Sequence, residues 1–185
     1  MEDMNFVEPI RDPELVGLIA EYLRNQSERN YIMFMIGIYT GLRITDILNL
    51  SVSDVKNRDT INLREKKTGK QKIVVLNPIL KKEFREYCKT MSKEERLIPQ
   101  YMNPLKAISR ITAYRILAKA AEEYGVENLG THSMRKTYGY HMYQQYKDVV
   151  SLQKLMNHSS PSITLRYIGI EQEQINNQSK NLKIF

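Results

Sequence analysis

The stretch YIMFMIGIYTGLRITDILNL, residues 31–50, decides the fold class of this chain. Its first half is a nearly continuous apolar run, which predicts a fully buried helix over residues 31–40. Gly41 is expected to end that helix, because glycine readily adopts the left-handed backbone that follows many helix C-termini. A short helix is predicted over residues 44–50, with its apolar residues on one face. This stretch therefore predicts two helices that meet at Gly41.

Further helices and one hairpin surround this central segment. Asp12 followed by Pro13 is typical of a helix start. Two short β-prone runs flank a polar turn that contains Gly69, which predicts a β-hairpin. The strands are expected over residues 60–63 and 72–76, and further helices over residues 79–91, 111–124, 133–146 and 149–156 and from Pro161 onward. The sequence therefore predicts an α+β fold that is mainly α-helical, with one small antiparallel sheet.

The chain has 185 residues, of which 42% are hydrophobic and 26% are charged. This length and composition predict one globular domain over residues 1–185. No apolar run approaches the ~18 residues of a membrane span, and the acidic N-terminus has no secretory signal pattern. Cys88 is the only cysteine, which excludes an intramolecular disulfide and a cysteine-based zinc site. We expect a cytoplasmic protein.

The net charge of +7 is concentrated in one segment of the chain. Residues 56–85 contain ten basic and three acidic residues, whereas the rest of the chain contains 18 of each. A second basic block, residues 101–120, holds four basic residues and no acidic residue. Clustered positive charge favours a polyanionic partner such as nucleic acid, although a basic cluster is equally typical of plain solvated surface.

Several catalytic motifs are missing from the sequence. Gly69-Lys70 is followed by Gln71 rather than by serine or threonine, so the phosphate-binding loop of nucleotide hydrolases is excluded. The spacings of the three histidines suit no common metal site. No serine-hydrolase motif is present either. We therefore predict no metal, nucleotide or other cofactor.

Three separated blocks place polar residues in suggestive settings. Residues 40–50 read TGLRITDILNL, residues 132–137 read HSMRKT, and residues 155–160 read LMNHSS, with TLRY following at residues 164–167. Together these blocks resemble the catalytic domain of the tyrosine recombinases, also called phage integrases. Their order and spacing match that family from about residue 12 to residue 170. The resemblance implies a tyrosine-recombinase-like catalytic domain that acts as a site-specific recombinase on double-stranded DNA.

The resemblance also implies a set of catalytic residues, which are Arg43, Lys67, His132, Arg135, His158 and Tyr167. Tyr167 would be the nucleophile that forms a 3′-phosphotyrosine link to DNA, without metal or ATP. His132 would be its base, and Lys67 would be the acid for the leaving oxygen. Lys66 is the alternative to Lys67, because adjacent residues on a strand face opposite ways. The candidates for DNA binding around the hairpin turn are Lys66, Lys70 and Lys72.

The sequence departs from the family pattern in three places. Asn157 stands where the family usually has glycine, and asparagine tolerates a left-handed backbone better than other residues. Lys136 replaces a frequent histidine, and no loss is expected from it. The helical DNA-clamp domain that usually precedes the catalytic domain is expected to be absent. The core is predicted over residues 12–170, and the tail over residues 171–185 is a candidate for docking on a neighbouring subunit.

The family works as tetramers on DNA, so the resemblance implies self-association on DNA. In solution we expect a monomer.

Two other functions stay open from the sequence. One is a DNA-binding accessory protein that has the recombinase fold without independent recombination. The other is a type IB topoisomerase-like enzyme that relaxes supercoils. Single residues also have simpler interpretations: Arg43 could pair with Asp46, its i+3 neighbour, and Tyr167 could be a packing tyrosine.

Overall fold

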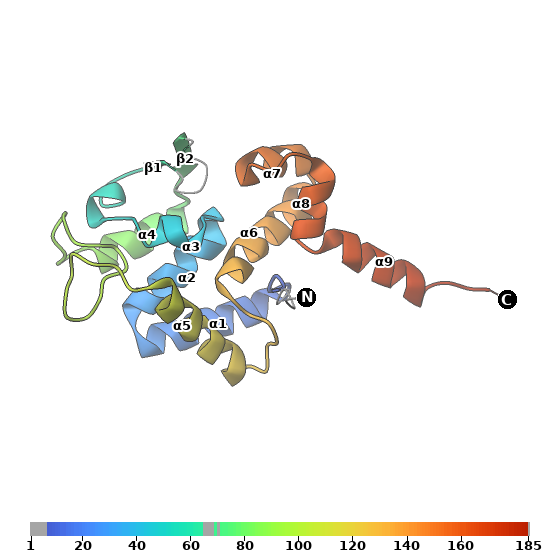
Figure 1. Cartoon of the computed structure of the whole chain (residues 1–185), viewed down its shortest axis with the longest axis horizontal. Coiled ribbons are helices and arrows are strands. Elements are labelled where there is room, and N and C mark those ends of the chain that lie inside the picture. Colours follow the sequence, from blue (N-terminus) through green and yellow to red (C-terminus); the bar gives the residue numbers. More distant parts are fainter. Residues whose placement is uncertain (1–6, 65–68, 70, 185) are drawn as a thin grey trace.

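The computed structural model of the protein describes residues 7–64, 69 and 71–184 (Figure 1). The elements in chain order are α1 (Pro13–Gln26), α2 (Glu28–Thr40), α3 (Ile44–Ile47), the 3₁₀-helix η1 (Val52–Asp54), β1 (Thr60–Arg64), β2 (Gln71–Val75), α4 (Pro78–Tyr87), α5 (Arg110–Glu123), α6 (Thr131–Tyr146), α7 (Val149–Met156), α8 (Pro161–Tyr167) and α9 (Ile170–Lys180). Over the described residues, the fold is helical apart from one two-stranded antiparallel sheet, which lies at the edge of the domain (Figure 1). The predicted fold class, α+β and mainly α-helical, is therefore confirmed.

Helix α2 forms the centre of the main hydrophobic core. Ile32, Met33, Phe34 and Ile36 are fully buried, and the helix packs against α1, α4 and α6. Gly41 follows it with φ +61°, which closes the helix as the sequence predicts. The buried run of this helix fixes where α6 and the turn after α2 lie, and both carry candidate catalytic residues.

The β-hairpin is antiparallel, with Leu63 opposite Lys72 in its register. Ile61 and Val74 face the core, whereas Ile73 is exposed on the other face of the sheet. Strand β1 continues one residue beyond its predicted end, to Arg64. Strand β2 is shifted by one residue, from the predicted range 72–76 to Gln71–Val75. One face of this sheet is therefore attached to the domain.

A second, smaller hydrophobic cluster joins α6, α7 and α8. Its buried members are Tyr140, Leu152, Met156, Ile168 and Ile170. Gly139 of α6 permits this close approach, because a Cβ there would lie 2.7 Å from Ile168 Cγ2 and 2.8 Å from Met156 Cε. The N-terminal half of α6 contributes to the main core and its C-terminal half to this second cluster, so α6 connects the two.

The segment before α1 lies across α6. The Ile10 amide donates to Thr137 Oγ1 at 2.9 Å, and the His141 ring donates from Nε2 to the Ile10 carbonyl at 2.9 Å. Arg11 then pairs with Glu8 at 2.7 Å and with Glu173 of α9 at 3.4 Å. This segment therefore contacts both the helix that carries Arg135 and the helix that follows Tyr167.

Several boundaries differ from the sequence predictions. Helix α3 ends at Ile47 rather than at residue 50, and α4 ends at Tyr87 rather than at residue 91. The polar tail forms α9, for which no element was predicted, and this helix projects away from the body (Figure 1). No helix among the described residues is long and apolar enough to cross a membrane.

Candidate active site

The turn between α2 and α3 positions Arg43. Thr40 Oγ1 donates to the Ile36 carbonyl at 2.6 Å, and accepts from the Leu42 amide at 3.2 Å. Gly41 reverses the chain in the left-handed conformation, and Arg43 then adopts an extended backbone at the N-cap of α3. Two helices packed in the core therefore determine where the Arg43 side chain starts.

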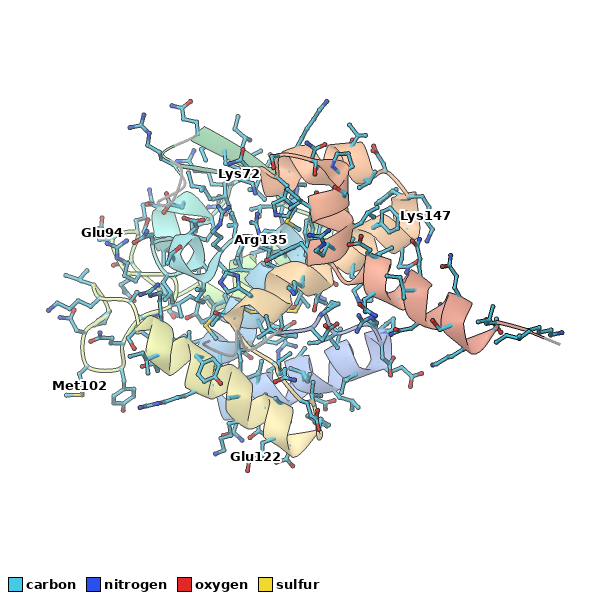
Figure 2. All side chains as sticks on the ribbon, turned by 45° about the vertical axis from the view of Figure 1, so that its right-hand side comes forward. Lys72, Glu94, Met102, Glu122, Arg135 and Lys147 are labelled. Atoms are coloured by element: carbon cyan, nitrogen blue, oxygen red, sulfur yellow. The ribbon has the colours of Figure 1, made fainter. Side chains whose placement is uncertain are left out.

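Arg135 connects this turn to the end of α7. Its side chain is 2% exposed in the middle of the molecule, where Figure 2 labels it. One guanidinium nitrogen donates to the Gly41 carbonyl and Nη2 donates to the Met156 carbonyl at 2.9 Å. Both acceptors lie at helix C-termini, whose partial negative charge stabilises a buried cation. Three segments far apart in the sequence thus meet at one guanidinium.

Asn157 caps the C-terminus of α7, with φ +55° in the left-handed region. This conformation confirms that asparagine supplies the turn for which the family usually has glycine. The His158 amide then donates to the Gln153 carbonyl at 3.0 Å, and the Gln153 side-chain amide donates to the His158 carbonyl at 3.1 Å. The backbone of His158 is held on both sides by one residue of α7.

The imidazole of His158 has a defined orientation. Its Nδ1 lies 3.0 Å from Thr164 Oγ1, and that hydroxyl lies 3.3 Å from the Ser160 carbonyl. Because the hydroxyl proton is directed to Ser160, we assign Nδ1 as the donor, which leaves Nε2 unprotonated in the neutral ring. Burial lowers the pKa of His158, and the Arg135 and Arg43 guanidiniums lower it further.

Tyr167 ends α8 and lies against His158. The two rings meet edge to face, with centroids 5.0 Å apart. Burial raises the pKa of the Tyr167 phenol, while the nearby guanidiniums of Arg135 and Arg43 oppose that rise. Arg135 also stabilises the phenolate through a hydrogen bond. The phenol keeps its proton at neutral pH, so a base must remove it before it can act as a nucleophile.

Lys136 approaches Tyr167 from α6. Its ammonium lies 5.2 Å from the centroid of the Tyr167 ring, and the residue is 7% exposed. Burial lowers the pKa of Lys136, the charge of Glu8 raises it and that of Arg11 lowers it. The sequence singles out Lys136 only as a replacement for a frequent histidine of the family, and this contact with Tyr167 was not predicted from it.

The other predicted residues lie as follows. His132 is exposed in the first turn of α6, three residues before Arg135 and on the same helix face. Lys72 is half-buried on β2, and its Nζ donates to the Leu155 carbonyl of α7 at 3.0 Å. The structure therefore brings Arg43, Arg135, His158 and Tyr167 together.

Three predicted lysines lie outside the described residues: Lys66, Lys67 and Lys70.

The family model described as the phage integrase family matches residues 10–174 of this chain. The chain belongs to the phage integrase family, the tyrosine recombinases. This membership confirms the resemblance found in the three sequence blocks. The probable integrase/recombinase YoeC of Bacillus subtilis is 48% identical over 170 residues, which cover 92% of this chain and 93% of that protein. A tyrosine recombinase of Pseudothermotoga lettingae is 26% identical and covers 99% of this chain and 68% of its own length.

Solved structures show the same fold. The crystal structure of the XerA recombinase superposes with a TM-score of 0.75 at 19% sequence identity, covering 97% of this chain and 67% of the XerA chain. A λ integrase fragment in a dimer bound to a core site superposes with a TM-score of 0.67 at 18% identity. The architecture of the helices and hairpin is therefore that of a recombinase catalytic domain.

Proposed function

We propose that this chain is a site-specific recombinase that cleaves and rejoins DNA strands through a 3′-phosphotyrosine formed on Tyr167. The observation that carries the proposal is the joint placement of His158 and Tyr167 within the field of the Arg43 and Arg135 guanidiniums. A phosphodiester is the anion that such a pair of guanidiniums suits, since each can donate paired hydrogen bonds to its oxygens. The relatives named recombinases and integrases support the same conclusion.

The proposed reaction is a transfer of a phosphoryl group from a sugar oxygen to tyrosine. His132 takes the phenol proton, the Tyr167 oxygen bonds to phosphorus, and the bond from phosphorus to the 5′-oxygen breaks. Lys67 gives its proton to that departing oxygen. Arg43 and Arg135 stabilise the negative charge on the non-bridging oxygens, and removal of one such donor commonly costs ~3–4 kcal/mol of transition-state stabilisation.

His158 is the remaining donor to the phosphate. Thr164 holds its Nδ1 proton, so Nε2 can donate to a phosphate oxygen when the ring takes up a second proton. A bound phosphate favours that uptake, because its negative charge offsets the guanidinium charges that lower the His158 pKa. The energy of the phosphodiester stays in the tyrosyl link, so rejoining the strands needs neither ATP nor metal.

We also propose the arrangement around this chemistry. Residues 12–170 form the catalytic core within a single domain, and four copies assemble on paired recombination sites. The exposed α9 and the extended residues after it carry apolar side chains that a neighbouring copy could cover, namely Ile175, Leu182 and Ile184. The proposed free form is a monomer, which sedimentation of the protein without DNA would test.

A suicide substrate tests the chemistry directly. A nicked duplex that carries the recombination site traps the cleaved strand on the protein, and a denaturation-resistant adduct is the expected product. The absence of an adduct from folded, DNA-bound protein would refute the proposal. Recombination between paired sites separates a recombinase from an accessory protein, and relaxation of supercoiled plasmid by the protein alone would identify a topoisomerase instead.

A further inference from the structure

The C-terminus of α7 holds two cations from other parts of the chain. The last four carbonyls of any helix lack partners within the helix. In α7, the Gln153 carbonyl accepts from the His158 amide at 3.0 Å and the Lys154 carbonyl accepts from the Asn157 amide at 3.1 Å. The next two carbonyls accept from cationic side chains, Leu155 from Lys72 at 3.0 Å and Met156 from Arg135 at 2.9 Å. Every carbonyl of the last turn is therefore satisfied.

The hairpin directs Lys72 toward this helix end. Side chains two residues apart on a strand share a face, and Val74, two residues after Lys72, is buried. Ile73 lies between them on the opposite face and is 70% exposed. Lys72 is labelled in Figure 2 where the hairpin strand meets α7. Its face of the sheet is the one that is turned to the protein.

The peptide dipoles of α7 favour this contact. The aligned peptide dipoles leave partial negative charge on the last carbonyls of a helix, which stabilises a cation placed there. Lys72 thus connects residues 83 positions apart in the chain. The segment that it holds lies immediately before Asn157 and His158, and it also provides the Met156 carbonyl that holds Arg135.

We propose that Lys72 is a positioning residue of the active site, which caps α7 from the hairpin and thereby fixes His158 and Arg135. This inference rests on the proposed function of the site. The role differs from that of a phosphate contact, because the ammonium acts on a protein carbonyl. The hairpin and the α7–α8 segment then behave as one unit when DNA binds.

Hydrogen exchange in the free protein tests the cap without DNA. Lys72→Met removes the ammonium and keeps an unbranched stem of similar length, and Lys72→Arg keeps a cationic donor. We expect the Asn157 and His158 amides to exchange at least about tenfold faster in Lys72→Met, since hydrogen bonds to charged groups are among the stronger ones. Lys72→Arg should exchange like wild type. Lys82→Met, at an exposed lysine of α4, is the matched control and should also exchange like wild type. Unchanged exchange in Lys72→Met would overturn the cap.

The salt dependence of DNA binding separates the cap from a phosphate contact. Each phosphate contact contributes about 0.9 to the slope of log affinity against log salt concentration. We expect Lys72→Met to keep the wild-type slope and to form the covalent adduct at least about tenfold more slowly, with the rate restored by Lys72→Arg. A slope reduced by about 0.9 together with an unchanged adduct rate would show a phosphate contact and overturn the inference. If wild type forms no adduct, the proposed function fails, and the exchange experiment still decides the cap.

Discussion

The imidazole of His158 and the phenol of Tyr167 meet edge to face, with ring centroids 5.0 Å apart and ring planes at 72°. This geometry holds the phenol next to an imidazole whose pKa the Arg43 and Arg135 guanidiniums lower. The same guanidiniums oppose the rise that burial causes in the pKa of Tyr167. One pair of arginines therefore favours the neutral form of His158 and the ionised form of Tyr167, until a phosphate offsets their charge.

Tyr167→Phe should abolish the covalent adduct while the protein stays folded. Phenylalanine keeps the ring against His158 and removes the oxygen that would bond to phosphorus. The loss of one hydroxyl costs only ~0.5–1.5 kcal/mol of folding stability. Denaturing electrophoresis after reaction with the suicide substrate gives the result, and Tyr146→Phe, at an exposed tyrosine of α6, is the matched control. An adduct formed by Tyr167→Phe would show that another residue is the nucleophile.

Lys136→Met should slow cleavage without preventing DNA binding. The ammonium lies 5.2 Å from the Tyr167 ring centroid, and a contact of this kind contributes ~0.5–2 kcal/mol. We expect the single-turnover adduct rate to fall by a factor of about two to thirty, and Lys136→Arg to recover most of it. Thermal unfolding of the same variants separates a loss of folded protein from a slower reaction. An adduct rate equal to that of wild type would show that Lys136 does not contribute to cleavage.

The stability of the protein should fall as the pH drops below 6.5, in part because of His158. Burial and two guanidiniums hold the folded-state pKa of His158 below its usual 6.5, so the unfolded state binds more protons in that window. Acid therefore favours unfolding there, and the contribution is absent above pH 6.5. Urea unfolding at several pH values measures this, and His158→Gln should reduce the slope of stability against pH. An identical slope in the variant would show that His158 does not contribute.

Gly139→Ala should destabilise the protein by ~1–3 kcal/mol. The added Cβ would lie 2.7 Å from Ile168 and 2.8 Å from Met156, and extra atoms in a packed core commonly cost that much. Gly17→Ala in α1 is the matched control, because no atom lies within 4 Å of its Cβ. Since alanine is the better helix former, the control should be neutral or more stable by up to ~1 kcal/mol. Chemical unfolding of both variants gives the comparison, and equal stabilities would contradict the close packing of α6 against α8.

Local signals explain why much of the fold could be predicted. The apolar run over residues 31–40 requires burial on all sides, and Gly41 ends the helix in the conformation that glycine favours. Asp12 accepts a backbone hydrogen bond at the start of α1, as its position before Pro13 predicts. These features depend on a few neighbouring residues, so they are visible in the sequence.

Long-range contacts explain what the sequence could not predict. Arg135 reaches the Gly41 carbonyl across 94 residues, and Lys72 reaches the Leu155 carbonyl across 83. Every residue type supplies a backbone carbonyl, so no sequence pattern marks a particular carbonyl as a hydrogen-bond partner. The helix α9 was also missed, because its polar residues have no apolar periodicity and Ile170 is its only buried residue within the described part of the chain.

The attachment of α9 has a mechanical consequence. This helix of 11 residues spans about 16 Å, and it begins three residues after Tyr167. Gly169 joins the two with φ +79°, a left-handed backbone conformation that favours glycine. A force applied to the far end of α9 is therefore transmitted to the backbone next to Tyr167. Experiments that immobilise the protein or attach a large fusion should do so away from its C-terminal end.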